Sequence, residues 1–95
     1  MIAEFRTYKC AAADLDRLAA RLRAAAVPVL ADLGAQVHGP WTRTRTGEGE
    51  MFYVVHWHDT AHMERGWLQF ARDSRWIEAK RSPIPVTISR DVWSV

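Results

Sequence analysis

The chain has 95 residues and a formal net charge of +2, which fits one small domain and, without a basic stripe of interleaved aromatic residues, argues against a nucleic-acid partner. Its only cysteine, Cys10, allows no disulfide within the chain and favours a reducing compartment. The first residues lack the pattern of a signal peptide, and no apolar run approaches the ~20 residues of a membrane span, so we expect a cytoplasmic protein with no membrane partner.

The first predicted strand covers residues 2–9, where side chains alternate with a period of two. Glu4, Arg6 and Tyr8 point to one side of this strand. An acid, a base and a phenol therefore lie in line on one face. That is an unusual content for a strand, and it makes these three residues candidates for function.

A long amphipathic helix follows from Asp14. Its apolar residues recur at spacings of three and four, and arginines occupy the other side. Gly34 is a suitable residue to end the helix. Pro28 lies inside the run, so we expect it to kink the helix or to split off the last turn.

Two further strands are predicted around a glycine-rich turn. Residues 36–46 form the second strand, bent or bulged at Gly39-Pro40, and residues 46–50 form a turn of hairpin length. Residues 51–58 form the third strand, with large side chains on both faces. We therefore expect both faces of the third strand to be covered.

The last third of the chain predicts a helix, a short second helix and a final strand. Asp59-Thr60 can cap a helix whose apolar side carries Met63, Trp67 and Phe70. Residues 75–81 form a short helix after a break at Asp73-Ser74. A proline-rich connector leads to the last strand, residues 86–93.

These elements give the order βαββαβ, which is typical of an α+β ferredoxin-like domain spanning residues 1–95. Such a domain has a four-stranded antiparallel sheet with helices on one face. The bare face would carry large apolar side chains, whose exposure to water is unfavourable. Pairing two sheets face to face would hide them, so we expect a homodimer.

The sequence resembles the NIPSNAP family. Glu4-Phe5-Arg6-Thr7-Tyr8 resembles the family's Glu-Leu-Arg-Thr-Tyr opening, and Asp73-Ser74-Arg75-Trp76 resembles its Asp-Pro-x-Trp break. The stretch from Tyr53 to the helix with Trp67 and Phe70 is similar as well. The resemblance implies a dimeric α/β barrel, in which two ferredoxin-like subunits pair their sheets and each can hold a small-molecule pocket.

The resemblance implies little about the reaction. Relatives in the dimeric α/β-barrel superfamily include cofactor-independent monooxygenases and polyketide cyclases, whereas many NIPSNAP-like proteins have no assigned reaction. The sequence also departs from the family pattern. Met63 replaces an arginine common in the second helix, and His56-Trp57-His58 ends the third strand. A direct transfer of function is therefore not justified.

The histidines are the first candidates for chemistry. His56 and His58 are two apart on a strand and should share a face, and His38 lies on the neighbouring strand. No cysteine or carboxylate stands at ligand spacing, so we predict no metal site. An imidazole suits acid–base work at neutral pH, so the predicted catalytic residues are His38, His56, His58 and Tyr8. The alternative is that these histidines are packed or cap a strand end.

Arg6 could bind substrate, because a guanidinium can clamp a carboxylate or polarise a carbonyl. For Glu4 and Arg6 we favour a structural interpretation, in which they pair with charges of the second subunit. The predicted substrate-binding residues are Arg6, Trp41, Trp57, Tyr53 and Glu4. The aromatic residues of the second helical region are expected to be core instead, namely Trp67, Phe70 and Trp76.

We predict a small cofactor-independent enzyme that acts on a hydrophobic aromatic or polyketide-like metabolite by general acid–base chemistry, as a cyclase, isomerase or monooxygenase does. The alternative is a non-catalytic dimeric protein that binds a small molecule or serves as an accessory protein. A third possibility is an interaction module without a ligand. The composition, rich in alanine and arginine, is associated with high-GC bacteria and their secondary metabolism.

Overall fold

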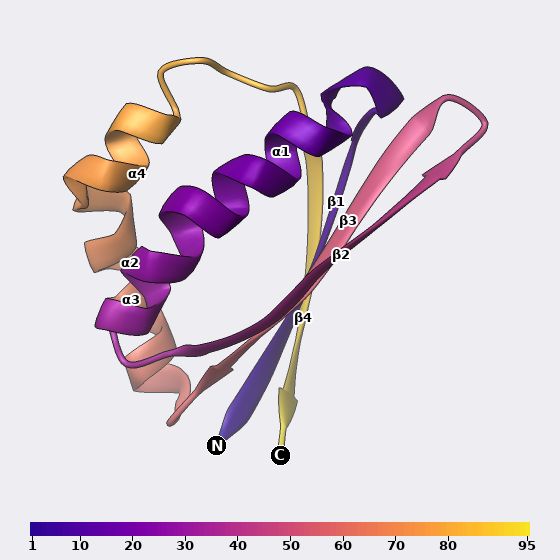
Figure 1. Ribbon diagram of the computed structural model, residues 1–95. Helices are drawn as coiled ribbons and strands as arrows, with labels where there is room; N and C mark the ends of the chain where they lie inside the picture. The colour runs from indigo at the N-terminus through magenta and orange to yellow at the C-terminus, as the bar shows by residue number, and fades with distance from the viewer.

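The computed structural model describes residues 1–95 and has the predicted βαββαβ order of a ferredoxin-like fold (Figure 1). The strands are β1 (Ile2–Ala11), β2 (Gln36–Arg45), β3 (Glu48–Trp57) and β4 (Thr87–Ser94). The helices are α1 (Leu15–Arg21), α2 (Val27–Asp32), α3 (Thr60–Arg72) and α4 (Ser74–Ala79). A short 3-10 turn precedes α1, and a π-helical turn at Leu22–Ala26 joins α1 to α2.

The strands form one antiparallel sheet in the order β2-β3-β1-β4. All helices lie on one face of this sheet, and the other face is bare (Figure 1). Strand β1 is central, so Arg6 stands opposite Tyr53 on β3 and Arg90 on β4. The polar side of β1 faces the helices, inside the subunit. This places Glu4, Arg6 and Tyr8 away from the bare face.

Pro28 disturbs the first helix as predicted, but through a π turn. The backbone N–H of Val27 donates to the carbonyl of Leu22, five residues back. In a regular helix the ring of Pro28 would clash with the carbonyl four residues back, and its missing N–H would leave that carbonyl unpaired. The wider π turn just before Pro28 accommodates both effects.

The β2–β3 hairpin has the predicted irregularity and a shorter turn than predicted. Pairing shifts between His38 and Trp41, at the predicted bend. Only Thr46 and Gly47 form the turn, both at positive φ (48° and 77°), as in the two-residue turns that match sheet twist. The predicted turn over residues 46–50 was therefore too long, because β3 already begins at Glu48.

Side-chain caps begin the two later helices. The carboxylate of Asp59 accepts from the backbone N–H of His62 at 2.7 Å, and that of Asp73 accepts from the N–H of Arg75 at 2.9 Å. Strand β3 ends at Trp57, so His58 lies beyond the strand. The predicted third strand, residues 51–58, was therefore one residue too long at this end, and the backbone N–H of His58 donates to Nδ1 of His62.

The core lies between the sheet and the helices. Its largest fully buried side chains include Trp57, Tyr53 and Leu30, together with the carboxylate of Glu4. Helix α3 comes close to the sheet at Gly66, where an added Cβ would lie 2.3 Å from Cζ3 of Trp57. None of the helices has the length and apolar character that a membrane crossing requires.

Candidate functional site

A polar cluster lies inside the subunit, between β1, β3 and α3. Its anchor is Glu4, whose side chain is 0% exposed. One carboxylate oxygen accepts from the indole N–H groups of Trp57 (3.0 Å) and Trp67 (2.8 Å). The other accepts from Arg6 (3.0 Å) and contacts Arg90 at 3.2 Å. Three hydrogen bonds and the ion pair with Arg90 engage both oxygens of this carboxylate, so Glu4 is committed to partners within the chain.

Arg6 occupies the centre of the cluster. Its Nε donates to the hydroxyl of Tyr53 at 2.9 Å, and its Nη2 donates to the hydroxyl of Tyr8 at 3.1 Å. The guanidinium carbon also lies 4.4 Å from the ring centroid of Trp67, a cation–π distance. Burial opposes the charge, but Tyr53, Tyr8 and Glu4 outweigh burial and raise the pKa of Arg6 above its ordinary value. Arg6 is therefore a fixed cation.

The hydroxyl oxygens of Tyr8 and Tyr53 lie 3.1 Å apart. One hydroxyl donates to the other, and each accepts from Arg6. Burial, together with the neighbouring Tyr8, raises the pKa of Tyr53 well above its ordinary value, against the opposing effect of Arg6. Tyr53 is thus a neutral phenol near neutral pH, and only one hydroxyl proton of the pair has an acceptor within the chain.

This cluster closes one end of a cavity of about 220 Å³ between the sheet and the helices. Apart from Arg6, Arg21 and the two tyrosines, the wall is aliphatic or aromatic: Leu18, Leu22, Ala26, Met51, Trp67, Phe70, Ala71, Trp76 and Ile88. No carboxylate, cysteine or histidine lines it. The inner cavity, as we call this space, therefore offers hydrogen-bond donors at an otherwise apolar surface.

The predicted histidines lie elsewhere. On the bare face, His38 Nε2 is 3.0 Å from His56 Nδ1, and the two rings meet edge to face. Tyr8 and Arg6 are on the other side of the sheet, so the structure does not bring the imidazoles and the phenol into one site. No group of three or more His, Cys, Asp or Glu side chains could hold a metal ion.

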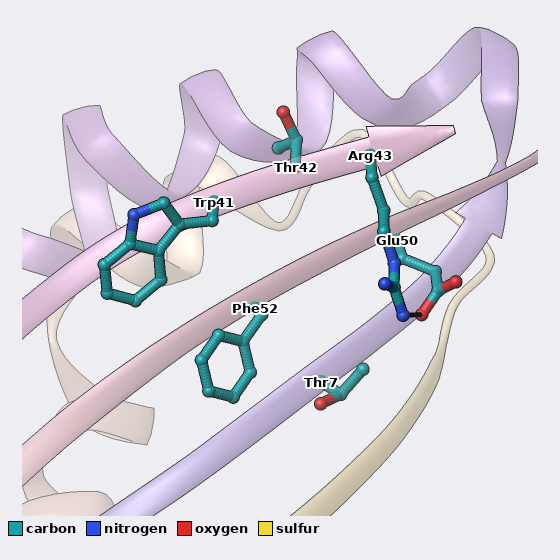
Figure 2. A pocket seen from close by; sticks show the side chains of 6 residues that line it. All are labelled: Thr7, Trp41, Thr42, Arg43, Glu50 and Phe52. Carbon is teal, nitrogen blue, oxygen red and sulfur yellow. Dashed lines mark hydrogen bonds and ion pairs between the residues drawn. The ribbon is translucent and has the colours of Figure 1, made fainter. Parts of the chain in front are cut away.

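The predicted aromatic residues are also divided between the two faces. Trp41 and Phe52 stack on the bare face with centroids 5.7 Å apart, beside Thr7, in an open hollow of about 320 Å³ (Figure 2). Arg43 and Glu50 pair at its other end at 3.2 Å (Figure 2). Tyr53 lines the inner cavity, whereas Trp57 is core, 1% exposed, and donates to Glu4.

Three residues of the inner cavity were missed by sequence reasoning. Trp67 and Trp76 were expected to be core, but both are half-buried and line the cavity. Arg21 was expected on a solvated helix face, but it lines the cavity as well. A sequence signal existed only for Trp67, because a strand that buries both Glu4 and Arg6 needs donors and acceptors above it.

Glu4 and Arg6, which were expected to pair with a second subunit, have their partners within the chain. Their partners are each other, Tyr8, Tyr53, the two indoles and Arg90. No buried side-chain nitrogen or oxygen is left without a hydrogen-bond partner. Each buried polar atom of the cluster thus has a partner in a single chain, although Arg6 and the tyrosine pair have more donor protons than acceptors.

Solved structures share this fold at low sequence identity. An uncharacterized NIPSNAP domain protein from Burkholderia xenovorans has a TM-score of 0.75 and 16% identity, over 100% of this chain and 94% of that one. A NIPSNAP family protein with unknown function from Agrobacterium tumefaciens has a TM-score of 0.78 and 12% identity, over 98% and 86%. A de novo designed protein, Foldit4, reaches a TM-score of 0.60 at 18% identity, over 99% and 96%.

These similarities show the fold alone. No curated protein matches the chain. The profile of the NIPSNAP family, in contrast, matches residues 3–91, which include the whole polar cluster and both walls of the inner cavity. The chain therefore belongs to the NIPSNAP family.

Proposed function

We propose that this protein binds a small, mostly apolar metabolite in the inner cavity and holds one oxygen of that ligand against Arg6 and the two tyrosines. The observation that carries this proposal is a surplus of donors at one end of an apolar space. A ligand oxygen would accept hydrogen bonds from the N–H and O–H groups that have no acceptor within the chain.

The donor surplus can be counted. A guanidinium has five N–H groups, and three of those on Arg6 are used by Glu4, Tyr8 and Tyr53. The tyrosine pair has two hydroxyl protons, of which one is used between the rings. A hydroxyl proton without an acceptor is less unfavourable on the more exposed ring, and Tyr8 is 9% exposed whereas Tyr53 is 1% exposed. The free proton therefore belongs to Tyr8. Tyr8 is therefore the donor that meets the ligand.

The walls favour an apolar ligand body. Met51, Phe70 and Trp76 present no group that a polar ligand could pair with, and burying apolar surface contributes roughly 25 cal/mol per Å². A flat aromatic or polyketide-like body suits the rings of Trp67, Phe70 and Trp76. The ligand class thus remains the one predicted from the sequence, although the side chains that hold it differ.

A second candidate is a cofactor-independent enzyme at the same site. Negative charge that develops on a carbonyl oxygen would be stabilised by Arg6 and Tyr53, and Tyr8 would give that oxygen a proton. The free phenolic proton favours this candidate. No base lines the cavity, so water would take the proton from carbon and later reprotonate Tyr8. The chain would supply electrophilic and acid catalysis only, as in an isomerisation or cyclisation of a substrate already acidic at carbon.

We also propose that the protein is a homodimer that pairs the bare faces of two sheets. Trp41 is 54% exposed and Trp93 is 64% exposed, and both lie on this face with Phe5 and Phe52. An exposed aromatic surface of this kind is rare on a monomer. The His38–His56 pair would then lie within or beside the dimer interface.

The binding proposal is tested with two naphthalenes that differ in one oxygen. Acetylnaphthalene carries a carbonyl, and ethylnaphthalene has the same body without it. Both are titrated against the wild type and Tyr8→Phe, followed by tryptophan fluorescence, since Trp67 and Trp76 line the cavity. We expect Tyr8→Phe to lower the affinity for the ketone about tenfold and to leave the affinity for the hydrocarbon unchanged.

His56→Ala is the matched control, because His56 lies on the other side of the sheet and should leave both affinities unchanged. If the wild type binds neither naphthalene, or if Tyr8→Phe weakens both equally, the proposed oxygen site is wrong. The enzyme candidate has its own readout. Exchange of the acetyl protons in deuterated water, followed by NMR, should be faster with the wild type than with Tyr8→Phe.

A further inference from the structure

A second cavity, of about 260 Å³, abuts the inner cavity. The two share a wall made of Tyr8, Leu18, Arg21, Trp76 and Ile88. The second cavity extends to the connector between α4 and β4, where Lys80, Pro83 and Ile84 line it. We call this second space the outer cavity. Together the two form an elongated apolar space with the Arg6 cluster at one end.

The wall of the outer cavity carries positive charge and no negative charge. Arg21 and Lys80 line the outer cavity, and no aspartate or glutamate does. Neither residue takes part in an ion pair anywhere in the chain. Every other arginine that lines a hollow of this protein, Arg6, Arg43 and Arg90, is paired with a glutamate.

Arg21 lies where the two cavities meet and is anchored there by a hydrogen bond. Its Nη2 donates to the backbone carbonyl of Ser82, so the side chain bridges α1 and the connector. This bond uses one of five N–H donors and leaves the guanidinium open to an acceptor. Burial, and then repulsion by Arg17, lower the pKa of Arg21. Burial and repulsion thus disfavour the positive charge of Arg21 in the protein without a ligand, and a bound anion would stabilise that charge.

We infer that the ligand is an amphipathic anion, with a carbonyl oxygen at Arg6 and Tyr8, an apolar body along the shared wall, and a carboxylate at Arg21 and Lys80. This inference rests on the proposed binding function and names the substrate class for it. A guanidinium suits a carboxylate because its parallel N–H groups match the two oxygens. Lys80, which is exposed, adds a second positive charge to the outer cavity.

Arg17 gives a natural comparison on the same helix. It lies about one turn before Arg21, and it pairs with Asp14 at 3.4 Å. Its charge is therefore already balanced, and it lines neither cavity. Removing the charge of Arg21 should therefore change the affinity for a charged ligand, whereas removing the charge of Arg17 should not.

The test compares an acetylnaphthoate with the matching acetylnaphthamide, which has the same ketone and body but no charge. A keto fatty acid and its primary amide form a second, flexible pair, so that a mismatch in length cannot mask the effect. Affinities are measured by isothermal titration calorimetry for the wild type, Arg21→Gln and Arg17→Gln. We expect the wild type to prefer at least one of the acids over its amide by about tenfold.

Arg21→Gln should abolish this preference, because it should lower the affinity for the acid and leave the affinity for the amide unchanged. Arg17→Gln should retain the preference. Equal binding of acid and amide in both pairs overturns the inference, while the binding function stands. A preference that survives Arg21→Gln overturns the role of Arg21. If neutral acetylnaphthalene and all four of these ligands fail to bind, the proposed function itself fails.

Discussion

The hydroxyl of Tyr8 lies 3.1 Å from that of Tyr53, although the two residues are not opposite each other in the sheet. Tyr53 stands opposite Arg6, and Tyr8 is two residues further along β1. The two phenols lean toward one another across this diagonal, and Arg6 donates to both oxygens. Two phenols and a cation thus form one donor unit at the end of the inner cavity.

The pKa of Tyr53 predicts a loss of stability at alkaline pH. Because burial raises this pKa in the folded state, the unfolded chain loses its proton first, near the ordinary value of about 10. The stabilisation by the neutral phenol is complete below that pH and declines as the pH rises toward the folded pKa. We expect the free energy of unfolding to fall more steeply above about pH 10 in the wild type than in Tyr53→Phe.

Urea unfolding at a series of alkaline pH values measures this difference, and the absorbance of tyrosinate reports the ionisation directly. Comparing the wild type with Tyr53→Phe cancels the contributions of the groups that the two proteins share. Parallel pH profiles for the wild type and Tyr53→Phe would show that Tyr53 ionises normally, against this prediction.

Glu4 predicts a large loss of stability on removal of one charge. Glu4→Gln keeps the shape of the side chain but leaves Arg6 buried without its anion and places an NH2 group against donors. Breaking a buried ion pair in this way costs about 3 kcal/mol or more. Urea unfolding at neutral pH should show this loss. Glu78→Gln, which breaks the exposed pair with Arg81, should show no measurable change.

Most of the fold could be predicted from the sequence, because the local signals agree with one another. The period of two on β1, the cap at Asp59 and the break at Asp73 all stand where they were expected. The errors were at boundaries. Thr46 and Gly47 alone make the hairpin turn, because two residues at positive φ suffice to reverse the chain.

The site could be predicted only in part. The alternation on β1 placed Glu4, Arg6 and Tyr8 on one face, but it could not say which face the helices cover, since either side of an isolated strand fits the pattern. For the same reason His38 and His56 were joined to Tyr8 in one hypothetical site, whereas the sheet separates them. The role of Arg21 depends on Ser82, 61 residues away, and has no local signal.

The bare face predicts that one charged substitution will separate the dimer. Phe52 lies at its centre, between Trp41 on β2 and Thr7 on β1 (Figure 2). Phe52→Glu would bury a carboxylate between two sheets, so we expect a monomer at concentrations where the wild type is a dimer. Size-exclusion chromatography with light scattering measures this.

Leu68→Glu is the matched control for charge, because Leu68 is 64% exposed on α3, on the helical side of the sheet. It should leave the dimer intact. A wild type that is monomeric at the highest concentrations used, or a Phe52→Glu variant that remains a dimer, would contradict pairing through this face.

Gly66 predicts a substitution effect of unusual sign. Replacing glycine by alanine within a helix normally stabilises it by roughly 1 kcal/mol. At Gly66 the added methyl group would lie 2.3 Å from Cζ3 and 2.5 Å from Cη2 of Trp57, which is 1% exposed and cannot move aside. Helix α3 would have to retreat, and the bonds from Trp57 and Trp67 to Glu4 would lengthen. We expect Gly66→Ala to destabilise the fold by about 2 kcal/mol, as overpacking does.

Urea unfolding measures the change, with Gln69→Ala on the exposed side of the same helix as the control. A Gly66→Ala protein more stable than the wild type would mean that α3 does not press on Trp57, and the contact that fixes Trp67 over Arg6 would lose its support.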